Sequence, residues 1–430
     1  TSIIAIESLE SNFSFTQILN NKLQIKELTV EKGYVNLEIY KDSTNFTTII
    51  NYFNPKKDKK GKKSNILTLE LNRIELKQNE LKIVDHTYKH HNKGVDFSDL
   101  AITEFSAIFD DISLDSTMQA NISNFSLKEK SGLIIQKLDT EASYGSKSME
   151  FKNLYLATNK SILQDYLKLE YDSIESFGNF INDVHVKANL RSSKISSNDI
   201  EYFAPDLRKV VFEAAIQKAN LSGTVANIVA KNVQLSTAKN TELLGAFTIK
   251  GLPKINSTVF NFNIKKLKTS AKDVDYLVAK LSDQKTFKLP QQLSSFDDVI
   301  FNGSFVGLYN DFNVNGNFNT ALGNLATSTK INIKNPLSYN GNISSDHFFV
   351  GTLIDNNTIN STAFNLKFNG SGLKIDDLSL KFDGNINNIS LQNYTYEKLL
   401  LTGNLDKKIL DLKGQIVDNN LDLNFTSIID

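Results

Sequence analysis

Residues 260–264 read FNFNI, and residues 364–368 read FNLKF. In both stretches apolar and polar side chains alternate strictly, and a period of two places the apolar side chains on one face of a β-strand. The same alternation restarts along the whole chain. The sequence therefore predicts one long β-sheet with an apolar face and a polar face.

The length of the chain bears on how that sheet is organised. A closed all-β domain usually holds roughly 200–250 residues, and this chain has 430. The clearest low-complexity break is the lysine-rich run at 55–63, and no Gly/Ser-rich or Pro-rich linker interrupts the strand pattern elsewhere. We therefore predict one continuous, elongated architecture over residues 1–430 that grows by repetition of strands.

Three parts can be distinguished within it. Residues 1–64 combine strands with a helix and end in the lysine-rich loop, residues 65–290 are strands with helical insertions, and residues 291–430 are nearly pure strand. The insertions are predicted near 174–181, 197–204 and 271–281. Ser197 is the predicted N-cap and Pro205 the terminator of the second insertion.

Local signals predict further features near the N-terminus. The apolar alternation between Leu23 and Ile39 is interrupted at Lys32-Gly33, which predicts a hairpin. A second strand pair is predicted to turn at Asn79-Glu80. Apolar residues from Phe46 to Phe53 recur at helical spacing, and a proline follows, so a helix is predicted there.

Composition excludes several classes of function. The 48 basic residues are balanced by 48 acidic ones, so no excess charge points to a nucleic-acid partner. The lysine-rich run could contact phosphate, but a solvated loop explains it better. The chain has no cysteine, which excludes disulfides, thiolate metal sites and a cysteine nucleophile.

A search for catalytic or metal-binding residues finds one weak candidate. His86, His90 and His91 lie close to several aspartates, a combination that can bind a metal ion. However, residues 86–94 are polar and end in glycine, as expected for the tip of a hairpin. No serine elbow, zinc-protease helix or dinucleotide-binding glycine motif occurs. We predict a protein that is not an enzyme, with no catalytic residues, metal or cofactor.

Three stretches, at 65–85, 123–154 and 220–250, resemble the N-terminal half of the TamB family, the translocation and assembly module proteins of the AsmA-like superfamily, in their Bacteroidota form. The resemblance extends over nearly the whole chain as a general sequence pattern, but it includes no invariant catalytic residues. It implies a U-shaped β-groove, or β-taco, of stacked antiparallel strands with an apolar lumen and a few short helices. It also implies a periplasmic protein anchored in the inner membrane that meets a BamA-type barrel of the outer membrane.

Neither the anchor nor the barrel-binding region is visible in this sequence. No apolar run approaches the ~20 residues that span a bilayer. The apolar pattern runs to both ends of the chain, which predicts a segment of a longer protein with an anchor upstream.

The predicted function is a periplasm-spanning conduit for phospholipids. Burial contributes about 0.8 kcal/mol per methylene, so moving a sixteen-carbon chain into water costs on the order of 10 kcal/mol, and an apolar lumen removes most of that cost. Such contacts are non-directional, so a lipid can slide along them. With roughly 25 strands about 4.8 Å apart, the sheet would extend on the order of 100 Å. The candidate lipid-contacting residues are Leu67, Leu69, Leu71, Ile74, Leu76, Phe260, Phe262, Ile264, Phe364, Leu366, Phe368, Leu421, Leu423 and Phe425.

Two other functions remain open at this stage. The chain could be a scaffold that assists insertion of outer-membrane barrel proteins, with an edge strand that pairs with the client. It could also be a structural β-solenoid whose apolar face packs on itself, because that fold has the same alternation.

Overall fold

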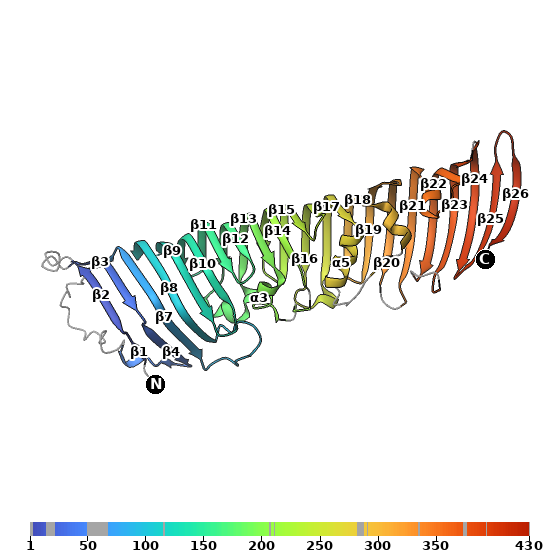
Figure 1. The fold of residues 1–430 in the computed structure, drawn as a ribbon. Coiled ribbons are helices and arrows are strands. Elements are labelled where there is room, and N and C mark those ends of the chain that lie inside the picture. Colours follow the sequence, from blue (N-terminus) through green and yellow to red (C-terminus); the bar gives the residue numbers. More distant parts are fainter. Residues whose placement is uncertain are drawn as a thin grey trace. The chain divides into compact units, whose positions relative to one another are not determined.

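A computed structural model describes residues 3–13, 22–49, 68–114, 117–205, 208–209, 211–281, 288–289, 291–333, 336–372, 376–392 and 394–429. These residues form an open, mainly antiparallel sheet with a few short helices (Figure 1), which confirms the predicted all-β class. The chain divides into two compact units, residues 1–208 with 215–225, and residues 209–214 with 226–430.

The first unit contains the strands up to β13 and most of β14. Its strands are β1 (Ile4–Ala5), β2 (Ser8–Phe13), β3 (Lys22–Glu31), β4 (Tyr34–Tyr40), β5 (Ser43–Thr44), β6 (Thr68–Leu71), β7 (Arg73–Asp85), β8 (Asp99–Leu114), β9 (Met118–Glu129), β10 (Ile134–Gly145), β11 (Ser148–Thr158), β12 (Ile162–Glu170), β13 (His185–Ser196) and β14 (Glu213–Gly223). Its helices are η1 (Ile174–Asn179), α3 (Phe180–Asp183) and α4 (Ser197–Ile200). From β7 to β13 each strand pairs antiparallel with the next.

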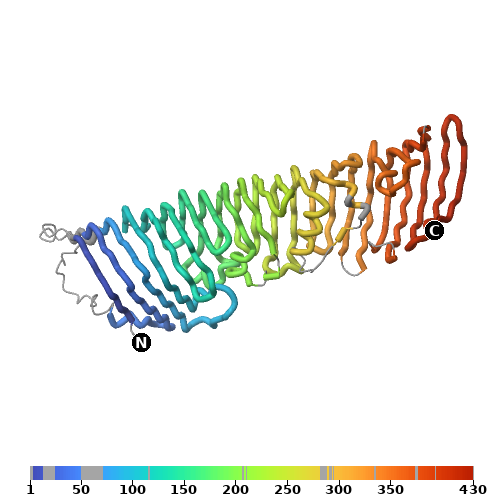
Figure 2. The backbone as a smooth tube through the Cα atoms, in the orientation of Figure 1, coloured from blue at the N-terminus to red at the C-terminus, as the bar shows by residue number. Residues whose placement is uncertain are grey.

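The second unit continues from β15. Its strands are β15 (Asn227–Thr237), β16 (Thr241–Lys250), β17 (Val259–Ser270), β18 (Asp298–Leu308), β19 (Asp311–Thr320), β20 (Gly323–Asn332), β21 (Ser338–Phe348), β22 (Ile359–Ser371), β23 (Ser379–Leu391), β24 (Tyr394–Asp406), β25 (Ile409–Val417) and β26 (Asp422–Ile429). Its helices are η3 (Ile255–Ser257), α5 (Ala271–Leu281), η4 (Gln291–Phe296) and α6 (Val350–Leu353). Consecutive strands pair antiparallel throughout and follow one another along the sheet (Figure 2).

The hairpin predicted between Leu23 and Ile39 is wrong. β3 and β4 do not pair with each other, and both pair in parallel with β7, one after the other. The backbone N–H of Gly33, between them, donates to the side chain of Asn79 at 2.7 Å. The Lys32-Gly33 signal therefore marks an interruption between two strands that run in the same direction.

The turn predicted at Asn79-Glu80 is also wrong, because β7 runs through it as one strand. Gln78 has a left-handed backbone, with φ of 51°, and the register with β8 shifts on both sides of Asn79. This is a β-bulge, in which an extra residue bends the strand without ending it. Polar residues serve in bulges as they do in turns, so the sequence signal is the same.

The three predicted helical insertions are present. α5 covers the predicted 271–281, η1 and α3 cover 174–183, and α4 covers the first four residues of the predicted 197–204. The N-cap of α4 is Ser196, one residue before the predicted Ser197, and its side chain accepts from the N–H of Asn198. Of the helix predicted at 46–53, residues 47–49 are helical, and the remainder lies outside the described residues together with the lysine-rich run.

Candidate functional site: the apolar face of the sheet

The register of the second unit aligns apolar side chains from strand to strand. Residues directly opposite each other in neighbouring strands lie on the same face of a sheet. Phe260 is opposite Ile249 on one side, and Phe262 is opposite Phe247 on one side and Phe305 on the other. The same matching continues to β26, so apolar side chains form rows that cross the strands.

We name these rows the apolar floor. Its large side chains are Ile249, Phe260, Phe312, Ile331, Tyr339, Leu380, Leu405 and Leu410 in the first row, Phe247, Phe262, Phe305, Val314, Phe368, Phe382 and Leu412 in the second, and Ile264, Ile343, Leu366, Leu401 and Phe425 in the third. All except Ile264 are half-buried rather than buried. A closed core would bury them, so this face is not sealed by a second layer of the described chain.

One margin of the floor is covered. There, η4 and α6 pack on the sheet, and a buried cluster forms from Leu322, Leu325, Phe348, Phe364, Ile386 and Leu399, with Phe296, Val350 and Leu353 against it. We name this cluster the covered margin. Four side chains of the third row, Ile343, Leu366, Leu401 and Phe425, pack against this cluster. They nevertheless keep part of their surface exposed, as the first two rows do.

α5 is held to the sheet by a buried carboxylate. Asp273 in its first turn is 4% exposed and accepts hydrogen bonds from the N–H of Asn240 at 2.7 Å and the hydroxyl of Thr241 at 2.9 Å. Thr241 also lies 2.8 Å from the hydroxyl of Thr269. A charge paired in this way fixes the helix on the ends of β16 and β17.

The opposite face of the second unit is polar and exposed. It carries Asn261, Asn263, Asn313, Asn315, Asn317, Lys330, Asn340, Asn342, Lys367, Asn369, Lys381, Asp383, Asn385, Thr402, Asp411 and Lys413, all exposed. The two faces therefore differ sharply, and within the described rows of the floor no side chain is charged.

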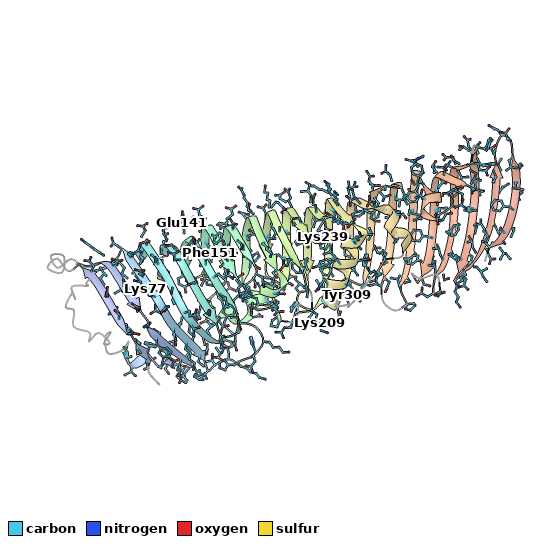
Figure 3. The ribbon with its side chains drawn as sticks, in the orientation of Figure 1. Lys77, Glu141, Phe151, Lys209, Lys239 and Tyr309 are labelled. Carbon is cyan, nitrogen blue, oxygen red and sulfur yellow. The ribbon has the colours of Figure 1, made fainter. Side chains whose placement is uncertain are left out.

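The first unit has the same two-faced construction. Phe151 of β11 is opposite Ala142 on β10 and Leu167 on β12. Its polar face carries Glu141, which accepts a hydrogen bond from the Asn153 amide at 2.7 Å; Phe151 and Glu141 are both labelled in Figure 3. Near η1 and α3 an aromatic cluster of Phe97, Tyr171, Phe177, Phe180 and Phe203 packs at one end of the strands.

The polar face of the first unit holds ion pairs that shift pKa values. The ammonium groups of Lys187 and Lys168, 2.9 Å and 3.1 Å away, lower the pKa of the Glu170 carboxyl. Burial, and then a hydrogen bond donated to Glu150 at 2.7 Å, raise the pKa of Tyr166 to about 12. Charge in this part of the chain is therefore neutralised on the polar face.

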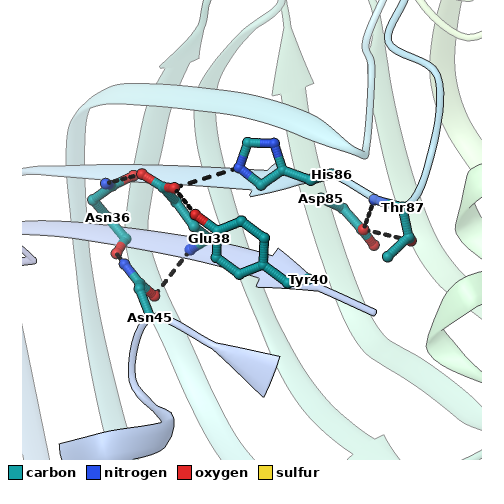
Figure 4. A network of polar contacts seen from close by, with 7 residues as sticks. All are labelled: Asn36, Glu38, Tyr40, Asn45, Asp85, His86 and Thr87. Atoms are coloured by element: carbon teal, nitrogen blue, oxygen red, sulfur yellow. Dashed lines mark hydrogen bonds and ion pairs between the residues drawn. The ribbon is translucent and has the colours of Figure 1, made fainter. Parts of the chain in front are cut away.

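His86 in the histidine-rich segment contacts a tyrosine and a glutamate. His86 stacks on Tyr40 with ring centroids 4.7 Å apart, and its Nε2 lies 3.4 Å from a Glu38 oxygen (Figure 4). The Tyr40 hydroxyl, and next the Asn36 amide, donate to Glu38 and lower the pKa of its carboxyl. Among the described residues no group of three potential ligands is placed to hold a metal ion.

Most of the predicted lipid-contacting residues lie on the apolar faces. Phe260, Phe262, Leu366, Phe368 and Phe425 belong to the floor, as does the buried Ile264. Leu71, Ile74 and Leu76 are half-buried on β6 and β7. Leu423 is 42% exposed opposite Ile416, and Leu421 lies in the turn before β26.

One further predicted residue is buried, and two cannot be placed. Phe364 is 8% exposed and belongs to the covered margin, because α6 packs over that end of β22. Leu67 and the side chain of Leu69 lie outside the described residues. The sequence-based selection missed Phe305, Phe312 and Phe382. Phe312 and Phe382 each have an apolar residue two positions away, Val314 and Leu380, and could have been found by that signal, whereas Phe305 has glycine at both such positions.

Comparison with known proteins gives no further guide. No family model, curated protein or solved structure matches this chain. Among the helices that the structure describes, none is both long enough and apolar enough to cross a bilayer.

Proposed function

We propose that this chain is a hydrophobic conduit that moves phospholipids between the inner and outer membranes, in the manner of the TamB family that its sequence resembles. The observation that carries the proposal is the apolar floor, a set of uncharged, half-buried side chains that continues across successive strands. Hydrocarbon is stabilised by such a surface without any directional contact, so it can move from one strand to the next.

A hydrocarbon ligand fits the floor better than a polypeptide does. A polypeptide that binds by strand addition needs unpaired backbone groups. From β16 to β25 each strand is paired on both sides, so the backbone beneath the floor has no free edge in that region. In this proposal the chain lies in the periplasm, and contacts with the inner membrane and a BamA-type barrel involve other parts of the protein.

Two measurements test the proposal. Mass spectrometry of lipid extracted from the purified protein should find phospholipid in near-stoichiometric amounts. The variants Phe262→Asp and Phe368→Asp should lose that lipid and retain their far-UV circular dichroism, because a charge on an open surface prevents acyl contact without entering a closed core.

Matched controls lie one residue away on the polar face. Asn263→Asp and Lys367→Glu add negative charge at exposed positions of the same strands and should keep their lipid. Protein free of lipid would contradict the proposal. Unfolding of both floor variants, with folded controls, would instead indicate a closed core and favour the structural solenoid.

A further inference from the structure

Aromatic rings of the floor lie on glycines of the neighbouring strands. Phe382 is directly opposite Gly403, and Phe425 is directly opposite Gly414. A methyl group built on either glycine would collide with the far edge of the opposing ring, at Cε1, Cε2 and Cζ. The tip of each ring therefore covers the glycine Cα, which is possible only if the ring lies along the sheet.

A third pair has the same arrangement. Tyr339 is opposite Gly370, and a methyl group on that glycine would lie 2.6 Å from Cε2 and 2.9 Å from Cζ of the tyrosine. We name these three the ring–glycine pairs. In an ordinary sheet side chains stand roughly perpendicular to the surface and interdigitate with a second layer, so rings lying flat are suited to a surface without such a layer.

Glycine recurs on this face despite its cost. Within a strand it loses backbone entropy and offers no side chain for packing. Each strand from β21 to β25 nevertheless carries one glycine on the apolar face, namely Gly341, Gly370, Gly384, Gly403 and Gly414. At Gly341 and Gly384 a methyl group would meet the backbone of the neighbouring strand, so the approach of the strands requires glycine there. At Gly403 and Gly414 the nearest atoms belong to a ring, so these glycines determine how close the ring lies to the sheet.

The size of the floor suits a straight hydrocarbon chain. From β21 to β26 there are five inter-strand spacings, about 24 Å in all. One leaflet of a bilayer has a hydrocarbon thickness of about 15 Å, so an extended acyl chain can lie within this distance. Flat rings give it a level surface, and the ring faces offer broad contact area.

We propose that the ring–glycine pairs form the acyl-contacting surface of β21–β26, and that Gly370, Gly403 and Gly414 are positioning residues that keep Tyr339, Phe382 and Phe425 flat so that a straight acyl chain can lie across them. This inference rests on the proposed function, since it names the part of the floor that the lipid touches and what fixes its shape.

The arrangement can be observed directly by NMR of the full chain labelled with [¹³Cα]glycine. Protons beneath an aromatic ring are shielded, so the α-protons of Gly370, Gly403 and Gly414 should be shifted upfield relative to those of Gly178. Gly178 is an exposed glycine of η1, where a methyl group would meet the nearest ring atom, Tyr88 Cε1, only at 3.9 Å. Addition of palmitate should move the three resonances and leave that of Gly178 unchanged. This measurement needs no variant beyond those used for assignment.

Variants test the positioning role. Gly403→Ala should lift the Phe382 ring and weaken palmitate binding about tenfold, equivalent to the contacts of about two methylene groups. Gly403→Ala combined with Phe382→Leu removes the collision and should restore most of the affinity. Gly178→Ala should bind as the unmodified protein does.

The outcomes separate this inference from the proposed function. Glycine resonances without upfield shifts would overturn the inference, because the rings would not lie flat. Palmitate binding that Gly403→Ala leaves unchanged would also overturn it, while the conduit would stand. If the unmodified protein bound no palmitate and carried no phospholipid, both would fail.

Discussion

The sheet from β7 to β13 and the sheet from β18 to β25 both present an apolar face, but they are shaped by different residues. In the first region nearly every strand contains a polar residue with a left-handed backbone, namely Gln78, Glu104, Asn124, Asn153, Asp165 and Ser192. The register shifts beside most of them, as at Lys152/Leu154. In the second region glycines lie on the apolar face. The β18–β19, β19–β20, β23–β24 and β24–β25 ladders have no register shift, and the shifts in the three ladders between β20 and β23 lie toward the covered margin.

The comparison shows two ways to shape the same kind of surface. A bulge bends its strand locally and increases its twist, and beside these bulges Leu138, Leu154 and Leu190 are buried. A glycine leaves the register intact and makes room for a ring on the next strand. The first region is therefore shaped by bulges in its backbone. The second is shaped by rings that lie over glycines of the neighbouring strand.

The largest expected effect is a difference in stability loss between substitutions in the covered margin and in the open floor. Phe364→Ala should lower the free energy of unfolding by about 3–5 kcal/mol, because it leaves a cavity in a buried cluster. Phe368→Ala, on the same strand and face, should cost only about 1–2 kcal/mol, because that ring is only partly buried. Urea unfolding followed by circular dichroism measures both, and equal losses would show that the floor is as closed as the margin.

The next effect tests the glycine-based region. Gly403→Ala should destabilise the fold by about 1–3 kcal/mol, as overpacking does, because the new methyl group meets the Phe382 ring. The double variant with Phe382→Leu should regain most of that loss, as a thermal unfolding scan would show. A loss that persists in the double variant would mean that the cost comes from the backbone and not from the ring.

The bulge-based region should respond to a different substitution. Asn153 has φ of 50°, which glycine adopts freely and a β-branched residue does not. Asn153→Val should therefore cost about 1–2 kcal/mol, whereas Asn153→Gly should change the stability by only a few tenths. Urea unfolding of the two variants measures the difference, and equal stabilities would show that the bulge relaxes without cost.

The smallest effect concerns the polar face of the first unit. The pKa of Tyr166 is about 12 in the folded chain, against an ordinary value of 10.0. The neutral phenol therefore stabilises the fold fully below pH 10, and this contribution is lost as the pH rises from 10 through 12. Tyrosinate absorbance should show a late-titrating group that disappears in Tyr166→Phe. An unchanged titration curve in that variant would contradict the assignment.

Much of the fold could be predicted from local patterns. Alternation such as that in FNFNI identifies strands because a residue's face depends only on its position in the strand. The apolar stripe of Val274, Leu277 and Val278 likewise identifies α5. Pairing partners could not be predicted in this way, because β3 and β4 pair with β7 far along the chain, and the polar residues around Asn79 suit a turn and a bulge equally well.

The sequence by itself determined that this chain forms strands with one apolar face, because side-chain alternation is a local property. Only the tertiary structure decided which apolar residues are buried and which stay partly exposed to solvent. Phe364 is buried under α6, whereas Phe368 stays partly exposed. It also decided that Gly403 lies beneath Phe382. These outcomes depend on register and on packing between residues distant in sequence, and no local pattern encodes them.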